Sequence, residues 1–446
     1  MARHTTSDNS TRLPPVALAW LTWGLLASLY FVGFFQRVAP AVMVDELMRD
    51  FSIAATLLGN LSAIYFYTYA AMQIPSGLLA DAIGPRRVGS WAAVVAAAGI
   101  ALFALADSLW MASVGRGLVG ASVAVAFVAC MKLAGHWFPA NRFATVTGIS
   151  LLIGNLGGVL AGVPLSEAVA GLGWRSAMLI SAGVTLALAA LVWLWVRDDP
   201  TERGYASHAH PEALSETAMS PRQSLKLVIS ERDTWLLFFA GGLIAAPVLT
   251  FAGLWGVPWL VQVHGLERSH AAAFTTTMLL GFAIGGPLLG ALSDRIGRRK
   301  LPYLGAALVH AACWVIFLLH EGLPAGALYL LFAAIGFSAG GLIVGFAFSR
   351  EVNHPGAAGT VGGVVNMAVL GFAAIQQSAI GWILDRNWQG VIIEGARVYD
   401  AAAYHAAFLW LAISALGAVV FVALTRETHC RLRFDANQRD NRRFTD

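Results

Sequence analysis

The sequence predicts an all-α membrane protein with twelve transmembrane helices in two six-helix bundles, and three observations support this fold class. First, the chain of 446 residues is 58% hydrophobic and only 12% charged, whereas soluble domains carry about 25% charged residues. Second, apolar runs long enough to cross a bilayer recur along the whole chain. Third, one polar segment separates these runs into two sets of six.

Twelve apolar runs of about 18 residues or more each predict a membrane-spanning helix. The runs are rich in Gly and Ala, which let helices pack closely in lipid. Their approximate limits, in chain order, are 15–41, 55–79, 89–107, 109–133, 142–166, 175–196, 233–262, 269–292, 302–320, 325–349, 357–384 and 403–425.

A stretch rich in Pro, Ser and His, "RDDPTERGYASHAHPEALSETAMSPRQS", lies between the sixth and seventh runs. Such a composition is typical of a linker. We therefore expect a tail, a first bundle, a linker, a second bundle and a second tail at residues 1–14, 15–196, 197–232, 233–425 and 426–446.

The basic residues predict the orientation in the membrane. The formal net charge is +4. With both termini in the cytoplasm, most Lys and Arg residues fall in cytoplasmic segments, which is the positive-inside bias. The surplus charge therefore indicates orientation and not nucleic-acid binding. We expect a monomeric, multi-pass protein in the lipid bilayer of a bacterial inner membrane.

No pattern of reactive side chains indicates an enzyme. Cys130, Cys313 and Cys430 have no metal-ligand spacing. A nucleophile–base constellation and a phosphate-cradling loop are also absent from the sequence. We therefore expect no catalytic activity, no cofactor and no metal site.

The two halves carry the same loop motif. "GLLADAIGPRR" and "GALSDRIGRRK" both read G-x-x-x-D-x-x-G-x-[RK]-[RK], and each follows the second run of its half. Such internal repeats are a feature of two-bundle transporters, which bind substrate at the midplane between the bundles. The motif residues that we expect to control conformation are Gly77, Asp81, Gly84, Arg86, Arg87, Gly290, Asp294, Gly297 and Arg298.

With twelve spans and a central linker, this doubled loop resembles the major facilitator superfamily over essentially the whole chain. The resemblance implies that the first Asp of the motif latches the two halves together on the cytoplasmic side. We carry that role to Asp81, with Gly356–Gly359 as its expected contact. The alternative is an ordinary basic turn without a latch.

Two arginines lie inside predicted helices, Arg37 in "FFQRVAP" and Arg116 in "SVGRGLVGA". At about 1.5 Å per residue, both lie roughly 10 Å below the outer surface, and in this superfamily both helices face the central cavity. None of the 25 Asp and Glu residues lies near a helix centre. Because guanidinium groups suit carboxylate or phosphate, the pair predicts an anion site. Two alternatives stay open: Arg37 snorkels to headgroups, or Arg116 is structural, as its "RxxxG" context suggests.

A second resemblance narrows the prediction. "FFQRVAPAVMVDELMRDFSI", "LSAIYFYTYAAMQIPSGLLADAIGPRR" and "HWFPANRFATVTGI" are similar to the organic-anion and sugar-phosphate carriers of the superfamily, which include anion symporters and organophosphate antiporters. The resemblance implies that Arg37 binds the acidic group of the substrate and that Arg116 supports it. It also implies contacts from Asn155 and Asn366.

The sequence departs from the proton symporters of that group. They carry Asp immediately before the helix-one Arg, where this chain has Gln36, and often Glu where it has Val123. We keep Gln36 as a candidate substrate ligand. Proton coupling through those carboxylates is in doubt, which leaves His310 as the embedded titratable alternative; a lone His in a helix is more often a packing residue.

The rest of the expected site is aromatic and polar. Tyr65 and Tyr69 share one helix face with Gln73, and Trp255 and Gln377 come from the second half. Such groups suit the non-ionic part of a small substrate.

The leading hypothesis is therefore a secondary transporter that moves a small organic anion, such as a carboxylate, sugar acid or phosphate ester, by alternating access. A proton, sodium ion or counter-anion stays open as the coupled species. The alternatives are a multidrug or metabolite efflux carrier and a non-transporting membrane sensor of an anionic metabolite.

Overall fold

The computed structural model describes residues 12–139, 142–208, 221–320 and 322–433. Within these ranges the chain is almost wholly helical. Eleven helices are long and apolar enough to cross a membrane, and the number of candidate spans rises to twelve when a bent helix pair is counted as one. The predicted all-α, multi-pass membrane fold is confirmed.

The first half contains the helices that correspond to the first six predicted spans. They are α1 (Val16–Val38), the 3₁₀ helix η2 (Ala39–Val42), α2 (Val44–Asp50), α3 (Ala55–Ala71), α4 (Gln73–Ile83), α5 (Pro85–Ala104), α6 (Leu109–Trp137), α7 (Phe143–Leu160), α8 (Val163–Leu172) and α9 (Trp174–Trp195).

The second half follows a linker that itself contains η4 (Pro200–Arg203) and α10 (Pro221–Ser230). Its elements are α11 (Arg232–Thr250), the π-helix η6 (Phe251–Trp255), α12 (Gly256–His264), α13 (Arg268–Ile296), α14 (Lys300–Leu319), α15 (Ala325–Ala339), α16 (Leu342–Val352), η7 (Pro355–Ala357), α17 (Ala358–Arg386), the antiparallel strands β1 (Ile392–Ile393) and β2 (Ala396–Arg397), and α18 (Ala401–Ala423). The hairpin was not predicted.

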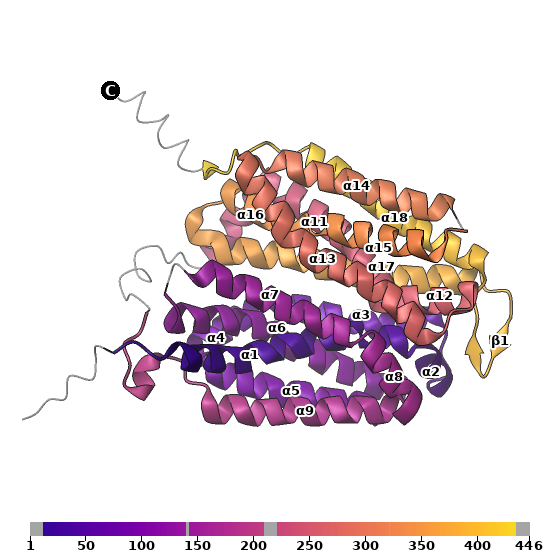
Figure 1. The fold of residues 1–446 in the computed structure, drawn as a ribbon, viewed down its shortest axis with the longest axis horizontal. Coiled ribbons are helices and arrows are strands. Elements are labelled where there is room, and N and C mark those ends of the chain that lie inside the picture. Colours follow the sequence, from indigo (N-terminus) through magenta and orange to yellow (C-terminus); the bar gives the residue numbers. More distant parts are fainter. Residues whose placement is uncertain (1–11, 140–141, 209–220, 321, 434–446) are drawn as a thin grey trace, which may run out of the picture.

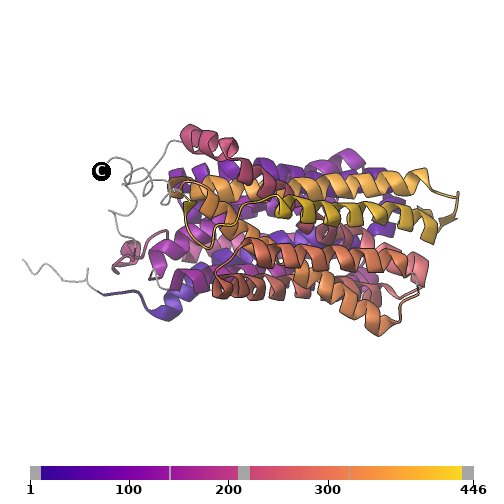
Figure 2. The ribbon, with the colours of Figure 1, turned by 90° about the horizontal axis from the view of Figure 1, so that it is seen from above.

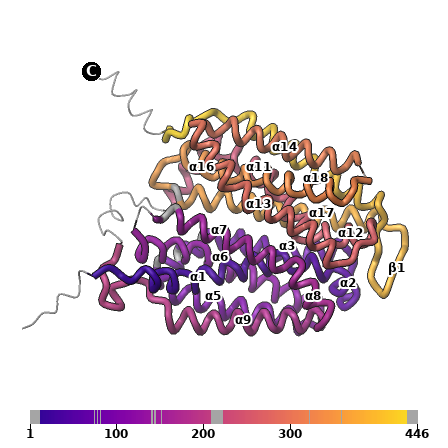
Figure 3. Tube along the Cα trace, in the orientation of Figure 1, coloured from indigo at the N-terminus to yellow at the C-terminus, as the bar shows by residue number. Residues whose placement is uncertain are grey.

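The helices of each half gather into one bundle, and the two bundles lie side by side with their helices running along the long axis of the molecule (Figures 1 and 3). The described start of the chain and its last described residues lie at one end, which we call the terminal end (Figure 2). The opposite end, with α2, α12 and the β1–β2 hairpin, is the hairpin end (Figure 1). Positive-inside bias predicts that the terminal end is cytoplasmic.

The two bundles touch where α3 crosses α17, and glycines permit the crossing. A Cβ atom at Gly59 would lie 2.5 Å from the carbonyl oxygen of Gln377, and one at Gly381 would lie 2.3 Å from that of Ala55. Both distances are far inside van der Waals contact. Small residues at such crossings allow backbones to approach closely in membrane proteins.

The repeated loop is held in the same way in both halves. The backbone N–H of Arg86, at the start of α5, donates to Asp198 at 2.6 Å. The backbone N–H of Arg299, just before α14, donates to Glu427 at 2.8 Å. Each acid follows the last helix of its half, so it satisfies a helix N-terminus that has no cap of its own.

Among the predicted latch residues whose side chains the structure describes, Arg87, Asp294 and Arg298 are exposed and the others are half-buried. Gly84 and Gly297 have φ values of 85° and 69°, which only glycine adopts readily. Asp294 forms an ion pair of 2.5 Å with Arg299 inside the second half. The side chain of Asp81 lies outside the described part of the structure, so its expected contact with Gly356–Gly359 stays a prediction.

Candidate functional site

Arg37 lies in an aromatic pocket near the end of α1. Its side chain is buried, with only 6% exposed. The guanidinium carbon lies 4.3 Å from the ring centroid of Phe34, 5.4 Å from that of Tyr69 and 5.8 Å from that of Phe66. Phe34 belongs to the same helix, one turn earlier, and the other two rings belong to α3. The rings stabilise the cation through their π faces.

No carboxylate among the described residues pairs with Arg37, and its Nε atom has no hydrogen-bond partner there. The side chain is buried among first-half aromatic residues, which argues against the snorkelling alternative. A buried cation without a counter-ion is costly in a low-dielectric setting. It therefore provides a site that an anion would stabilise.

Arg116, which is 2% exposed on α6, makes a different kind of contact. Its Nη1 atom donates to the backbone carbonyl of Gln36 at 2.7 Å, whereas its Nε and Nη2 atoms have no partner among the described residues. The ring of Tyr65 adjoins both arginines, with its centroid 5.1 Å from the guanidinium carbon of Arg116 and 6.0 Å from that of Arg37. Both guanidinium groups therefore lie near the ring of Tyr65, but that of Arg116 is hydrogen-bonded to the backbone.

The side chain of Gln36 turns away from Arg37. Its amide nitrogen donates to the hydroxyl of Ser181 on α9 at 2.9 Å. This contact lies within the first half and links two of its helices. Gln36 therefore contributes to bundle packing in this conformation.

Asn155 on α7 and Asn366 on α17 are both half-buried, and they belong to different halves. Polar side chains in this setting on membrane helices usually face the interior of the bundle or a water-filled cavity. They stay candidate substrate contacts.

Trp255 and Gln377 are fully buried near the junction of the two halves. The indole nitrogen of Trp255 donates to the carbonyl oxygen of Gln377 at 3.1 Å, and the amide of Gln377 donates to the carbonyl of Leu249 at 3.3 Å. Trp255 ends the π-helix η6, an irregularity that is frequent at functional sites. η6 also reaches the site, since a Cβ atom at Gly253 would lie 3.9 Å from the carbonyl oxygen of Arg37.

His310 is fully buried between α14 and α15, where its hydrogen bonds are satisfied. Its Nδ1 atom lies 3.1 Å from the carbonyl oxygen of Ile335, and its Nε2 atom accepts from the indole of Trp314 at 3.1 Å. These partners require the neutral tautomer with the proton on Nδ1. The geometry is that of a packing histidine within the second half and offers no support for a coupling role.

The sequence did not identify the polar contacts that join the halves, and those that the structure describes lie at the hairpin end. Glu46 of α2 forms an ion pair of 2.5 Å with Arg268 of α13, and Gln262 of α12 donates to Asp45 at 3.3 Å. Asp385 and Tyr399 of the second half also accept hydrogen bonds from the first residues of α3. Charged residues at the helix ends on the predicted outer side were the sequence signal that could have indicated these contacts.

Two membrane-embedded helical bundles, joined by a linker and closed against each other at one end, define a two-bundle membrane transporter. The chain belongs to the Major Facilitator Superfamily, whose family model matches residues 26–376.

Two relatives named as transporters are about a quarter identical to this chain over the parts that align. A probable sulfoacetate transporter of Cupriavidus necator is 25% identical over 280 residues, which are 62% of this chain and 65% of that protein, just under two thirds of its length. A galacturonate transporter of Dickeya chrysanthemi is 26% identical over 281 residues, 61% of this chain and 80% of the relative.

A solved structure supports the fold. It is a bacterial homologue of the human lysosomal transporter Spinster in an inward-facing, unoccupied conformation, and it matches with a TM-score of 0.70 at 18% sequence identity. The match covers 92% of this chain and 96% of that one.

Proposed function

We propose that this protein is a secondary transporter of a small organic anion and that Arg37 binds the acidic group of its substrate. The observation that carries the proposal is the buried guanidinium group of Arg37, 6% exposed, that no described carboxylate neutralises. A planar guanidinium binds carboxylate, sulfonate or phosphate through parallel hydrogen bonds.

The rings around Arg37 suit a small substrate. Phe34, Phe66 and Tyr69 cover the cation, so a ligand reaches it with one acidic end rather than with an extended charged surface. Asn155 and Asn366 provide hydroxyl or carboxylate contacts from the two halves. Two of the relatives are named for sulfoacetate and galacturonate, which are small molecules of this chemistry, and this supports the proposal.

The bundles exchange access to the site by rocking about it, as in other two-bundle transporters. The polar contacts at the hairpin end hold that end closed in this conformation. With the terminal end in the cytoplasm, as the positive-inside bias predicts, the structure corresponds to a state closed toward the outside. Anion binding reduces the cost of enclosing an unpaired cation when both ends are closed.

The test is uptake of radiolabelled galacturonate and sulfoacetate into proteoliposomes that contain the purified protein. The wild-type protein is expected to take up at least one of them. Arg37→Ala is expected to reduce uptake by two orders of magnitude or more, whereas Arg37→Lys keeps the charge but loses the bidentate geometry and retains a small fraction.

The matched control is Arg222→Ala, which removes an exposed arginine of α10 in the linker and is expected to leave uptake unchanged. Full uptake by Arg37→Ala would exclude Arg37 as the anion ligand. Anion binding without flux in the wild-type protein would instead indicate a membrane sensor.

A further inference from the structure

Pro40 leaves a backbone carbonyl of the first membrane helix without its usual partner. α1 ends at Val38 and continues as the 3₁₀ helix η2, in which Pro40 is the second residue. In a regular α-helix the carbonyl of Gln36 would accept the N–H of residue 40, four positions later. Proline has no N–H. In hydrocarbon, where water cannot substitute, such a carbonyl must find another donor.

Arg116 is that donor. Its Nη1 atom lies 2.7 Å from the carbonyl oxygen of Gln36, and the side chain is 2% exposed, so water does not compete. The contact crosses from α6 to α1 at the position where α1 changes its helical geometry. An arginine therefore completes the hydrogen bonding of a helix that belongs to a different part of the sequence.

The carbonyl that Arg116 holds belongs to the same rigid peptide unit as the backbone nitrogen of Arg37. Fixing the plane of this peptide unit fixes the direction in which the Arg37 side chain leaves α1. The guanidinium of Arg37 then lies 4.3 Å from the ring of Phe34 and 5.4 Å from that of Tyr69. Tyr65 adds to the same framework, because its hydroxyl donates to the carbonyl of Gly33 at 2.7 Å.

We propose that Arg116 is a positioning residue, which replaces the N–H that Pro40 lacks and thereby aims Arg37 at the substrate. The effect on substrate binding rests on the proposed function of Arg37. The hydrogen bond that Arg116 donates in place of the N–H missing at Pro40 does not depend on a substrate. A positioning role differs from direct anion binding by Arg116 in one respect. The effect of replacing Arg116 depends on the residue at position 40 only if Arg116 acts through the Gln36 carbonyl.

The test is a double-mutant cycle on the apparent melting temperature of the purified, ligand-free protein. Arg116→Leu leaves the Gln36 carbonyl unpaired and is expected to lower the melting temperature. Pro40→Ala restores the missing N–H, so the double variant is expected to recover at least half of that loss. Arg116→Lys, which keeps one donor, is expected to lose less than Arg116→Leu. Pro247→Ala, which changes another proline inside a membrane helix, is the control and is expected to show no coupling to Arg116.

The proposal would be overturned if Arg116→Leu lowered the melting temperature equally whether position 40 is proline or alanine. If Arg116→Leu does not accumulate in the membrane, recovery of the protein in the double variant is the expected result, and equal absence of the double variant overturns the proposal as well.

A second measurement separates positioning from stability. The probes are galacturonate and sulfoacetate, and the readout is the concentration of each that half-saturates the thermal shift or the uptake. Arg116→Leu is expected to raise this concentration at least tenfold, and Pro40→Ala is expected to reverse most of the increase. If the double variant regains its melting temperature but still needs the higher anion concentration for half-saturation, Arg116 contacts the anion directly. That result would overturn its positioning role. Failure of Arg37→Ala to affect either probe would count against the proposed function alone, since the cycle needs no ligand.

Discussion

Asp385 caps a helix that belongs to the other half of the protein, through Thr56. One carboxylate oxygen of Asp385, at the end of α17, accepts the backbone N–H of Thr56 at 2.8 Å and its hydroxyl at 2.5 Å. The other oxygen accepts the N–H of Ala55 at 3.2 Å. The residue in the N-cap position of α3 is Ala54, which has no side chain for capping. The N-terminus of α3 is therefore satisfied in this way only while the halves touch at the hairpin end.

Replacing Asp385 with Asn is expected to shift the protein toward conformations that are open at the hairpin end. The amide nitrogen cannot accept a hydrogen bond, so the start of α3 loses one of its two carboxylate acceptors, and the N–H of Ala55 then depends on the hydroxyl of Tyr399, to which it also donates at 3.2 Å. A helix cap contributes about 1 kcal/mol, which corresponds to roughly a fivefold change in population. Spin labels at the exposed Asp107 and His320, in a background without the native cysteines, report the separation of the halves by pulsed electron paramagnetic resonance.

Asp400→Asn is the matched control for this substitution. Asp400 caps α18 by accepting the N–H of Ala403 at 2.9 Å, and both residues lie in the second half. Its loss is expected to lower stability without changing the distance between the labels. Identical label distances in Asp385→Asn and the wild-type protein would show that the cap does not control closure.

The ion pair between Glu46 and Arg268 is expected to behave as a reversible charge contact. Reversing either charge alone, in Glu46→Arg or Arg268→Glu, places like charges together and favours the open hairpin end. The double reversal is expected to restore the wild-type label distance. The pair is partly exposed, at 15% and 29% of the two side chains, so we expect an effect of about 1 kcal/mol or less, which high salt reduces. Single reversals that keep the closed distance at low salt would contradict the prediction.

Gly381→Ala is expected to prevent closure at the hairpin end. The added Cβ would lie 2.3 Å from the carbonyl oxygen of Ala55 in the other half, and neither backbone can yield that space. Transport of any substrate should fall by more than tenfold, with the label distance held in the open state. The matched control is Gly371→Ala on the same helix, where a Cβ meets nothing within 4 Å. Normal transport by Gly381→Ala would mean that the two helices do not meet in this way during the cycle.

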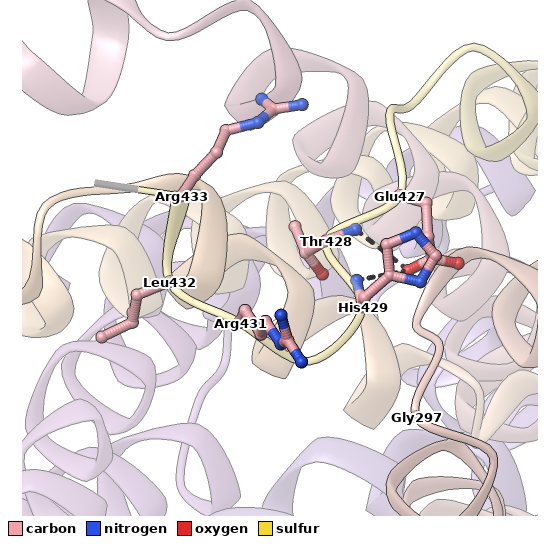
Figure 4. A pocket seen from close by; sticks show the side chains of 7 residues that line it. All are labelled: Gly297, Glu427, Thr428, His429, Arg431, Leu432 and Arg433. Carbon is pink, nitrogen blue, oxygen red and sulfur yellow. Dashed lines mark hydrogen bonds between the residues drawn. The ribbon is translucent and has the colours of Figure 1, made fainter. Parts of the chain in front are cut away.

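Glu427 is expected to stabilise the second half in a pH-dependent manner. Partial burial raises the pKa of this carboxyl group, but hydrogen bonds from the backbone N–H groups of Arg299, His429, Thr428 and Lys300 outweigh it and leave the pKa below its ordinary value of 4.5. Figure 4 shows Glu427 beside Thr428 and His429 in the surface pocket at the terminal end.

Because the folded-state pKa is depressed, this stabilisation is complete above pH 4.5 and is lost as the pH falls through the folded-state value. Glu427→Gln should therefore melt at a lower temperature than the wild-type protein at pH 7. The difference should shrink as the pH is lowered below 4.5. A constant difference across that range would indicate that the charge of Glu427 makes no contribution.

Hydropathy predicted the membrane-spanning helices to within a few residues. The eighth predicted span, 269–292, corresponds to α13 at Arg268–Ile296, and the sixth, 175–196, to α9 at Trp174–Trp195. Helices in lipid satisfy their own backbone, so their existence depends mainly on local composition. The π-helix η6 and the β1–β2 hairpin have no such local signal, because packing between distant segments determines both.

The sequence predicted individual residues of the candidate site but not the contacts between them. An arginine without a nearby acid in the sequence predicted that Arg37 lies buried and unneutralised, because no residue of the first helix could offset its charge. The sequence also contained Pro40 and Arg116, but no local pattern relates two residues on different helices. The bond from Arg116 to the Gln36 carbonyl exists because α6 packs against α1.

The sequence by itself determined that this protein crosses the membrane many times, that it consists of two related halves, and that it carries uncompensated positive charge within its helices. These properties follow from the transfer of side chains between water and lipid, which each segment undergoes independently of the others. Only the tertiary structure decided which carbonyl Arg116 satisfies and which helix Asp385 caps. Residues 80 and about 330 positions apart form those hydrogen bonds, and their energy depends on separations of a few ångströms that only the packing of the bundles sets.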